Sequence, residues 1–323
     1  MFESKILQGD CLEVLKTLPD NSIHCTITSP PYWGLRNYGV NGQLGLEKTP
    51  QEYVTKMVEV FREVKRVLCD DGTLWLNLGD SYHGSWGNSG KRPELDGTES
   101  TQREKNCDYI SRGGWDNRRE RPPSSYKIEG LKPKDLVGIP WMTAFALRAD
   151  GWYLRSDIIW NKKNCMPESC TDRPTKSHEY IFLLSKSANY YYDSEAIKEP
   201  NQDSYNGKRG TTQTRKKMQS AMRDLSDKES MHKYSTEGRN KRDVWTIATM
   251  PYKGAHFATF PLELIKPCVL AGCPEGGTIL DPFGGSGTTG VVAKTLKRNS
   301  ILIELNPKYC KMAEKRINGN SMF

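Results

Sequence analysis

The turn that follows residue 28 carries groups suited to binding a planar amino group. A strand-like run over 22–28 leads directly into the residues Ser-Pro-Pro-Tyr-Trp. The two prolines stiffen the turn and, because neither has an N–H, leave the carbonyls of Ser29 and Pro30 free to accept hydrogen bonds from outside. The rings of Tyr32 and Trp33 offer flat faces for stacking. This arrangement suits a base with an exocyclic amino group, although the turn by itself also fits a rigid loop with core aromatics.

A second segment, near the end of the chain, has the pattern of a nucleotide-binding loop. An apolar strand ends in Asp281 and is followed by Pro-Phe-Gly-Gly-Ser-Gly and a helical pattern. Gly285 and Gly287 allow a tight turn and the approach of a ligand to the backbone N–H groups of the helix. The next strand ends in Glu304, 23 positions after Asp281. An acidic residue about 20 positions after such a loop commonly binds ribose hydroxyls, so we predict a nucleoside-containing cofactor.

Three other kinds of loop share parts of this pattern. A P-loop requires a lysine before the Ser or Thr, whereas here Thr288 follows Gly287 directly, which disfavours triphosphate hydrolysis. The dinucleotide pattern Gly-x-Gly-x-x-Gly matches at Gly285, Gly287 and Gly290. However, a carboxylate at Asp281 would repel a pyrophosphate, while it could pair with a cationic methionine moiety. An ordinary glycine-rich loop is the remaining alternative.

Positive charge is concentrated in one part of the chain. The 323 residues carry a formal charge of +8, and 13 Lys and Arg against 7 Asp and Glu lie in 198–253. Few large apolar residues accompany them, so the segment is either a solvated insertion or a surface that neutralises phosphates. Its attachment to a nearly neutral body favours nucleic acid. The segment 84–130 is close to neutral, and we expect a long surface loop there.

Composition excludes several classes of protein. No apolar run approaches the ~18 residues of a membrane helix, and the start of the chain lacks the pattern of a secretory signal. The nine cysteines are scattered and odd in number, which favours a reducing, cytoplasmic setting over a disulfide scaffold. None has the spacing of a zinc site, so we expect no metal.

Short β-rich runs alternate with helical patterns. Expected strands span 5–7, 23–28, 73–78, 156–160, 180–184, 278–280 and 300–304, and expected helices span 11–18, 50–68, 141–149, 260–270, 287–296 and 307–317. This alternation predicts an α/β fold whose mostly parallel sheet has helices on both faces. No helical pattern separates the strands at 156–160 and 180–184, so we expect an antiparallel pair at the end of the sheet.

Together, the Ser-Pro-Pro-Tyr turn and the Asp-Pro-Phe-Gly-Gly-Ser-Gly-Thr loop resemble the amino-group DNA methyltransferases that use S-adenosylmethionine. The turn precedes the loop and the basic segment lies between them, which is similar to the order in the beta group of that family. The resemblance covers nearly all of the chain outside 84–130 and 198–250. It implies a permuted Rossmann-like methyltransferase sheet with an inserted recognition region. The parts would be 1–197 (catalytic), 198–253 (target recognition) and 254–323 (cofactor binding).

The resemblance also implies roles for individual residues. The implied catalytic residues form the turn: Ser29, Pro30, Pro31 and Tyr32. The implied cofactor-binding residues are Asp10, Thr259, Phe260, Asp281, Pro282, Phe283, Gly284, Gly285, Gly287, Thr288 and Glu304. We expect DNA contacts from an aromatic residue beside the turn and from the basic segment, namely Trp33, Lys208, Arg209, Arg215, Lys216, Lys217, Arg239, Lys241 and Arg242.

Within that family, Ser-Pro-Pro-Tyr is usual in N4-cytosine enzymes, and Asp-Pro-Pro-Tyr or Asn-Pro-Pro-Tyr in adenine enzymes. The resemblance therefore implies site-specific transfer of a methyl group from S-adenosylmethionine to the N4 amino group of a flipped cytosine in double-stranded DNA. N6-adenine methylation is the alternative, and a non-catalytic DNA-binding protein with this fold is an alternative of another class. A cognate restriction endonuclease would be a functional partner, and the oligomeric state is left open.

Carbon-5 methylation of cytosine would need a cysteine nucleophile. Pro267 and Cys268 form the dipeptide that such enzymes use, but they lie in the apolar helical run 264–270. We therefore interpret Cys268 as a small buried hydrophobic residue.

Overall fold

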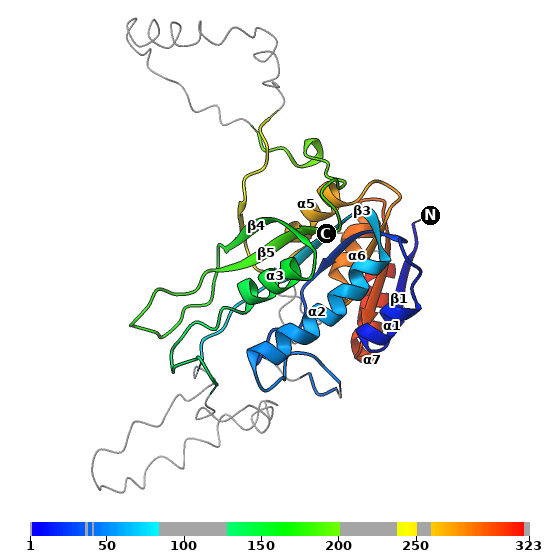
Figure 1. The fold of residues 1–323 in the computed structure, drawn as a ribbon. Helices are drawn as coiled ribbons and strands as arrows, with labels where there is room; N and C mark the ends of the chain where they lie inside the picture. Colours follow the sequence, from blue (N-terminus) through cyan, green and yellow to red (C-terminus); the bar gives the residue numbers. More distant parts are fainter. Residues whose placement is uncertain are drawn as a thin grey trace, which may run out of the picture.

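The computed structural model describes residues 2–35, 38–40, 42–83, 128–200, 238–250 and 260–319. Helices cover both faces of one sheet (Figure 1). Its strands are β1 (Ser4–Gln8), β2 (Ile23–Thr28), β3 (Leu68–Leu78), β4 (Tyr153–Lys162), β5 (His178–Ser185), β6 (Val244–Ile247), β7 (Thr278–Asp281) and β8 (Asn299–Glu304). The helices are α1 (Cys11–Thr17), α2 (Pro50–Val67), α3 (Ile139–Ala149), α5 (Leu262–Gly272), α6 (Thr288–Thr295) and α7 (Pro307–Asn318), with a 3₁₀ turn, η2 (Glu195–Ile197).

The sheet is mostly parallel, as predicted. Its strand order is β1-β8-β7-β2-β3-β5-β4-β6, and β5 runs antiparallel to both of its neighbours. The expected antiparallel pair of β4 and β5 is therefore confirmed. It does not end the sheet, however, because β6 pairs in parallel with β4 at the outer edge. The sequence analysis did not predict β6, whose four residues lie within the basic segment and include the buried Trp245.

Two apolar clusters form the core, one on each face of the sheet. The alternation of β3 divides its side chains between them, because Leu74 and Leu76 belong to one cluster and Trp75 to the other. On the first face they meet α2 through residues such as Phe61. On the second face α5 contributes Cys268, which is buried, in agreement with its interpretation as a hydrophobic residue.

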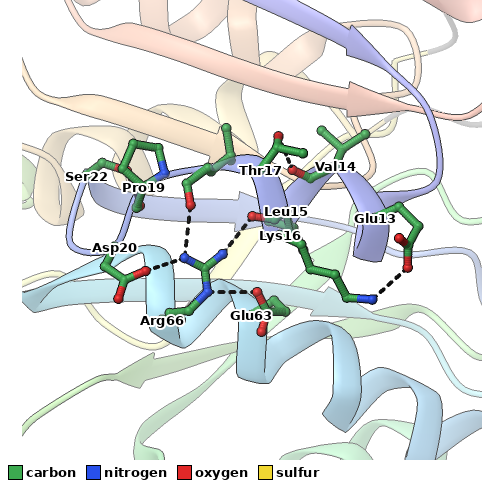
Figure 2. Close-up of polar contacts among 11 residues, drawn as sticks. Glu13, Val14, Leu15, Lys16, Thr17, Pro19, Asp20, Ser22, Glu63 and Arg66 are labelled. Atoms are coloured by element: carbon green, nitrogen blue, oxygen red, sulfur yellow. Dashed lines mark hydrogen bonds and ion pairs between the residues drawn. The ribbon is translucent and has the colours of Figure 1, made fainter.

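The start of α2 follows from local sequence. The side chain of Thr49 caps the helix by accepting a hydrogen bond from the backbone N–H of Glu52 at 3.1 Å, and Pro50 occupies the first turn. Near the end of α2, Arg66 donates to the carbonyls of Leu15 and Leu18 at 2.8 and 2.9 Å (Figure 2). These contacts join α1 to α2 beside the beginning of β2, at the edge of the sheet where the parallel strands begin.

The functional groups predicted from sequence lie at the opposite end of the strands, along the edge of the sheet formed by the carboxyl ends of the parallel strands. The chain leaves β7 toward β8 on one side and leaves β2 toward β3 on the other, so the strand order reverses between β2 and β7. Open α/β sheets bind ligands at such a switch point. Because β5 is antiparallel, its first residues reach the same edge, with Tyr180 opposite Leu78. Among the described residues no helix is long and apolar enough to cross a membrane.

Candidate active site

The two motifs predicted from sequence meet at this switch point. The Oγ1 atom of Thr28 donates a hydrogen bond of 2.7 Å to Oδ1 of Asp281, across 253 positions of sequence. The parallel pairing of β2 with β7, which sets Thr26 beside Leu280, brings the ends of both strands together. The catalytic turn and the glycine loop therefore start from neighbouring strand ends.

Asp281 holds the glycine loop in place. Its side chain is buried, and burial raises the pKa of the carboxyl above its ordinary value. Besides Thr28, it accepts hydrogen bonds from the hydroxyl of Thr289 at 2.6 Å and from the backbone N–H of Phe283 at 3.1 Å. The carboxylate thus ties β7, the loop and α6 to β2. This use of its oxygens differs from the expected direct pairing with a cationic ligand.

The loop has one closed side and one open side. Gly285 and Gly287 have φ values of +49° and +81°. A Cβ atom on Gly287 would lie 2.8 Å from Cβ of Ala313, so α7 packs directly against this glycine. Among the described residues, a Cβ atom on Gly285 would have only the carbonyl of Phe283 within 4 Å, at 3.8 Å. The backbone at Gly285 therefore faces open space that a ligand can enter.

Glu304 and Asp10 lie at the ends of adjacent strands next to this loop. Burial raises the pKa of Glu304, whose Oε2 accepts from the N–H of Gly285 at 2.8 Å and whose Oε1 accepts from the N–H of Asn306 at 2.7 Å. Asp10 caps α1 by accepting from the N–H of Leu12 at 3.0 Å. An open glycine loop with carboxylates fixed beside it fits a cofactor that contains a nucleoside.

Most of the remaining predicted cofactor residues belong to the same loop. Thr288 is buried, and its hydroxyl oxygen accepts a hydrogen bond of 2.9 Å from Arg316 of α7. Arg316, which the sequence analysis missed, also donates to Oγ of Ser286 at 2.9 Å. Pro282 and Gly284 are buried, Phe283 is partly exposed, and Phe260 packs against the α5 side of the core. Thr259 lies outside the described residues.

The predicted acceptors of the turn differ in burial, because Pro30 is buried. Ser29 is half-buried, and no described residue donates a hydrogen bond to the carbonyl of Pro30. The carbonyl of Pro31 differs, because it accepts from the hydroxyl of Tyr53 at 2.9 Å. That bond anchors the turn to α2 and leaves the preceding carbonyl for a ligand.

A polar network that the sequence analysis did not identify lies behind Tyr32. Its hydroxyl donates to Oε2 of Glu179 at 2.7 Å, and Lys162 pairs with the other carboxylate oxygen. Asn77 donates to the same Oε2 atom at 3.2 Å. Burial, together with the negative charge of Glu179, raises the pKa of Tyr32 well above its ordinary value. The only sequence signals were polar residues at the ends of apolar strands.

Trp33 does not offer the free stacking face that the sequence analysis expected. Its side chain is 3% exposed and packs in the core, and its indole N–H donates to the carbonyl of Glu47 at 2.9 Å. Burying so large an apolar ring stabilises the fold more than leaving it exposed at the turn would. A role for Trp33 in contacting DNA is therefore wrong for this arrangement.

Three of the predicted DNA-binding residues surround Glu199. Its carboxylate lies 2.9 Å from Nε of Arg242, 3.5 Å from Arg239 and 3.9 Å from Lys241. One negative charge thus offsets part of three positive charges, and the cluster stays cationic beside the start of β6. The other predicted basic residues, Lys208, Arg209, Arg215, Lys216 and Lys217, lie outside the described residues.

Fold and site together define an α/β protein with a permuted sheet, in which the glycine loop after β7 adjoins the Ser-Pro-Pro-Tyr turn after β2. Residues 23–315 match the family model described as DNA methylase, and the chain belongs to this family. This membership confirms the family that the two motifs resemble.

Curated relatives agree with this membership. The Type II methyltransferase M.SmaI of Serratia marcescens is 48% identical over 313 residues, which are 97% of this chain and 90% of the relative. M.Cfr9I of Citrobacter freundii, also a Type II methyltransferase, is 46% identical over 314 residues, 97% of this chain and 87% of the relative.

The fold is shared with solved structures of lower sequence identity. PvuII DNA methyltransferase (cytosine-N4-specific) has a TM-score of 0.62 at 18% identity, and the matched region covers 99% of this chain and 88% of the PvuII chain. TTHA0409 from Thermus thermophilus, solved in complex with S-adenosyl-L-methionine, has a TM-score of 0.54 at 22% identity over 98% of this chain and 97% of its own. These similarities confirm the predicted fold class.

Proposed function

We propose that this DNA methylase transfers a methyl group from S-adenosylmethionine to the N4 amino group of a cytosine in double-stranded DNA. The observation that carries the proposal is the hydrogen bond between Thr28 and Asp281, because it sets the Ser-Pro-Pro-Tyr turn directly beside the glycine loop. Ser29 occupies the position where adenine enzymes of the resembled family usually have Asp or Asn. The similar PvuII enzyme is named as cytosine-N4-specific.

The cofactor would bind along the carboxyl edge of β1, β7 and β8. The open side of Gly285 would receive its methionine part, and Glu304 and Asp10 would accept hydrogen bonds from the ribose and adenine. Bound there, S-adenosylmethionine supplies an electrophilic methyl group on a sulfonium. Asp281 would act indirectly. Its hydrogen bonds with Thr28 and Thr289 keep the loop at a set distance from the catalytic turn.

The turn would activate the amino group. The lone pair of a cytosine amino nitrogen is delocalised into the ring, which makes the nitrogen a poor nucleophile. Hydrogen bonds from its two N–H groups to Oγ of Ser29 and the carbonyl of Pro30 favour a tetrahedral nitrogen and free that lone pair. Positioning and electrostatics carry the step, without a covalent enzyme intermediate. The partly exposed ring of Tyr32 would contact the base.

The cytosine must leave the duplex to reach this turn, at a cost of a few kcal/mol. Contacts between phosphates and the basic segment 198–253 would offset that cost. The exposed Arg242 and its neighbours Arg239 and Lys241 lie beside β6, and we assign them to the DNA contacts together with Lys208, Arg209, Arg215, Lys216 and Lys217. Because the relatives are named as Type II enzymes, a cognate restriction endonuclease would be a functional partner.

Digestion of methylated DNA to nucleosides, followed by mass spectrometry, tests the proposal. We expect N4-methylcytosine as the product; N6-methyladenine would replace the N4-cytosine assignment by the adenine alternative. Binding of DNA without any methyl incorporation would favour the non-catalytic alternative. The variant Ser29→Ala should lose methyl transfer and retain binding of S-adenosylmethionine, and full activity in this variant would contradict the role given to Ser29.

A further inference from the structure

The proposed role of Ser29 requires its hydroxyl to act in one direction. A serine hydroxyl can donate or accept a hydrogen bond, whereas the amino group of a base has only N–H donors to offer once its lone pair is used. Ser29 must therefore direct its own proton away from the base. The hydroxyl of Tyr32, 3.4 Å from Oγ of Ser29, is the acceptor available for that proton.

Tyr32 can accept from Ser29 only if its own proton points elsewhere, and two acceptors ensure this. Oε2 of Glu179 lies 2.7 Å and Oδ1 of Asn77 lies 3.1 Å from the tyrosine hydroxyl. The amide of Asn77 is oriented by its nitrogen, which donates to the carbonyl of Tyr180 at 3.1 Å and to Glu179 at 3.2 Å. The tyrosine proton thus faces the acceptors, and a lone pair faces Ser29.

The donor-to-acceptor direction of these hydrogen bonds, from Ser29 through Tyr32 to Glu179, originates in an ion pair. An ionised carboxylate can only accept hydrogen bonds, and the ammonium group of Lys162 pairs with Oε1 of Glu179, which leaves Oε2 to face Tyr32. The two side chains are 22% and 13% exposed, so water competes little with this pair. Lys162 also lies 4.8 Å from the ring centre of Trp160, a contact that keeps it beside Glu179.

We propose that Glu179 and Lys162 are positioning residues that act through Tyr32 to make Ser29 a hydrogen-bond acceptor, so that the pocket selects a base with an amino group over one with a carbonyl at the same place. The inference deepens the proposed function and rests on it. A uracil in place of the target cytosine would present a carbonyl oxygen to an oxygen lone pair, which is repulsive. The ion pair therefore contributes to the choice of substrate without touching it.

The variant Glu179→Gln tests the direction of the hydrogen bonds that link Ser29, Tyr32 and residue 179. Lys162 would draw the amide oxygen and turn the amide nitrogen, a donor, toward Tyr32. We expect single-turnover methyl transfer to slow by about 10- to 100-fold, the cost of one reversed hydrogen bond in a buried site. Binding of S-adenosylmethionine should stay unchanged, because Glu179 does not touch the glycine loop. Lys162→Met should behave similarly, and Lys162→Arg, which keeps the charge, should restore most of the rate.

A double-mutant cycle separates positioning from a structural role. In a Tyr32→Phe background, Glu179→Gln should cause no further loss, since the residue through which it acts is gone. The preference of the enzyme for duplexes with cytosine over uracil at the target position, measured by competition, should fall in Glu179→Gln. Glu63→Gln is the matched control: Glu63 accepts from Arg66 at 2.8 Å at the far edge of the sheet (Figure 2), and it should leave the rate and the preference unchanged.

Three results would overturn the inference: an unchanged rate in Glu179→Gln, an equal further loss in the Tyr32→Phe background, or an unchanged preference for cytosine. Failure of the proposed function is read separately, from the nucleoside made by the unmodified enzyme. A wild-type product other than N4-methylcytosine would remove the proposed function before any variant is compared.

Discussion

At the scale of single residues, the site depends on close packing around Tyr32. Gly79 follows β3, and a Cβ atom at this position would lie 2.6 Å from Cε2 of Tyr32 and 3.4 Å from the carboxyl carbon of Glu179. The tyrosine ring is fixed at its hydroxyl and crowded at its edge. The absence of a side chain at Gly79 is what allows the hydrogen bonds behind the turn to form.

Gly79→Ala should therefore displace the Tyr32 ring. Overpacking of this kind costs about 1–3 kcal/mol, and here the cost falls on the position of Tyr32, which we propose contacts the base. We expect a slower single-turnover rate with unchanged affinity for S-adenosylmethionine, measured by calorimetry. A variant with the full wild-type rate would show that the position of Tyr32 tolerates movement.

The buried carboxylate of Asp281 supports a prediction about stability. Thr28→Val keeps the shape of the side chain and removes one of the donors to Asp281, which should lower the unfolding free energy by about 1–3 kcal/mol. Because burial already raises the pKa of Asp281, the folded state loses stability as pH rises through that pKa. The loss caused by Thr28→Val should grow over the same rise, since only the ionised form depends fully on the donor.

Urea denaturation at a series of pH values measures this effect. Thr55→Val is the control, because the hydroxyl of Thr55 bonds only the carbonyl of Gln51 on the exposed face of α2. A loss in Thr28→Val that does not vary with pH would show that the hydroxyl acts independently of the charge on Asp281.

At the scale of elements, the glycine loop combines two glycines with different tasks. Gly287 allows α7 to pack against the start of α6, since a Cβ atom there would also lie 3.0 Å from the Cα atom of Ala313. Gly285 borders open space at the end of β8. Both have positive φ, so each requires glycine for conformation, but only one of them faces the proposed cofactor.

Alanine substitutions should distinguish these tasks. Each substitution costs roughly 1–2 kcal/mol for the left-handed backbone conformation. Gly287→Ala should destabilise the protein further through its clash with α7. Gly285→Ala should weaken binding of S-adenosylmethionine more than it lowers the melting temperature. Equal cofactor affinity in Gly285→Ala and the wild type would mean that the ligand does not lie against this part of the loop.

At the scale of the whole molecule, one sheet covered by helices on both faces carries the site (Figure 1). The parallel strands and the antiparallel β5 bring the proposed catalytic groups to the end of the sheet where the parallel strands finish. Positive charge is concentrated in the segment 198–253, which enters the sheet through β6. The basic segment joins the sheet beside β4, and its cationic cluster at Glu199 lies just before the start of β6.

Neutralising part of that segment should weaken DNA binding without affecting the chemistry. We expect the triple variant Arg215→Gln, Lys216→Gln and Lys217→Gln to bind DNA less tightly and to reduce the slope of log K against log salt by about one for each phosphate that is no longer neutralised. Fluorescence anisotropy at several salt concentrations measures this slope. The same change at three lysines outside the basic segment, Lys5 of β1, Lys16 of α1 and Lys315 of α7, should leave the slope unchanged, and equal slopes in both variants would contradict the assignment.

Much of the fold follows from local sequence, because helix caps, apolar periodicity and glycine turns involve residues that are close along the chain. The helix over 50–68 and the strand over 23–28 are of this kind, and the structure confirms both to within one residue. The four-residue β6 could not be found in this way, since its pairing with β4 decides its conformation more than its own residues do.

The sequence by itself determined which chemical groups the protein has for binding and catalysis. These are a turn with free acceptors, a loop able to bind a nucleoside, and a basic segment between them. Only the tertiary structure decided which groups meet. The bond from Thr28 to Asp281, the network around Tyr32 and the burial of Trp33 all depend on strand order and register. No local pattern encodes those contacts, because they join segments whose separation in sequence exceeds any helix or turn.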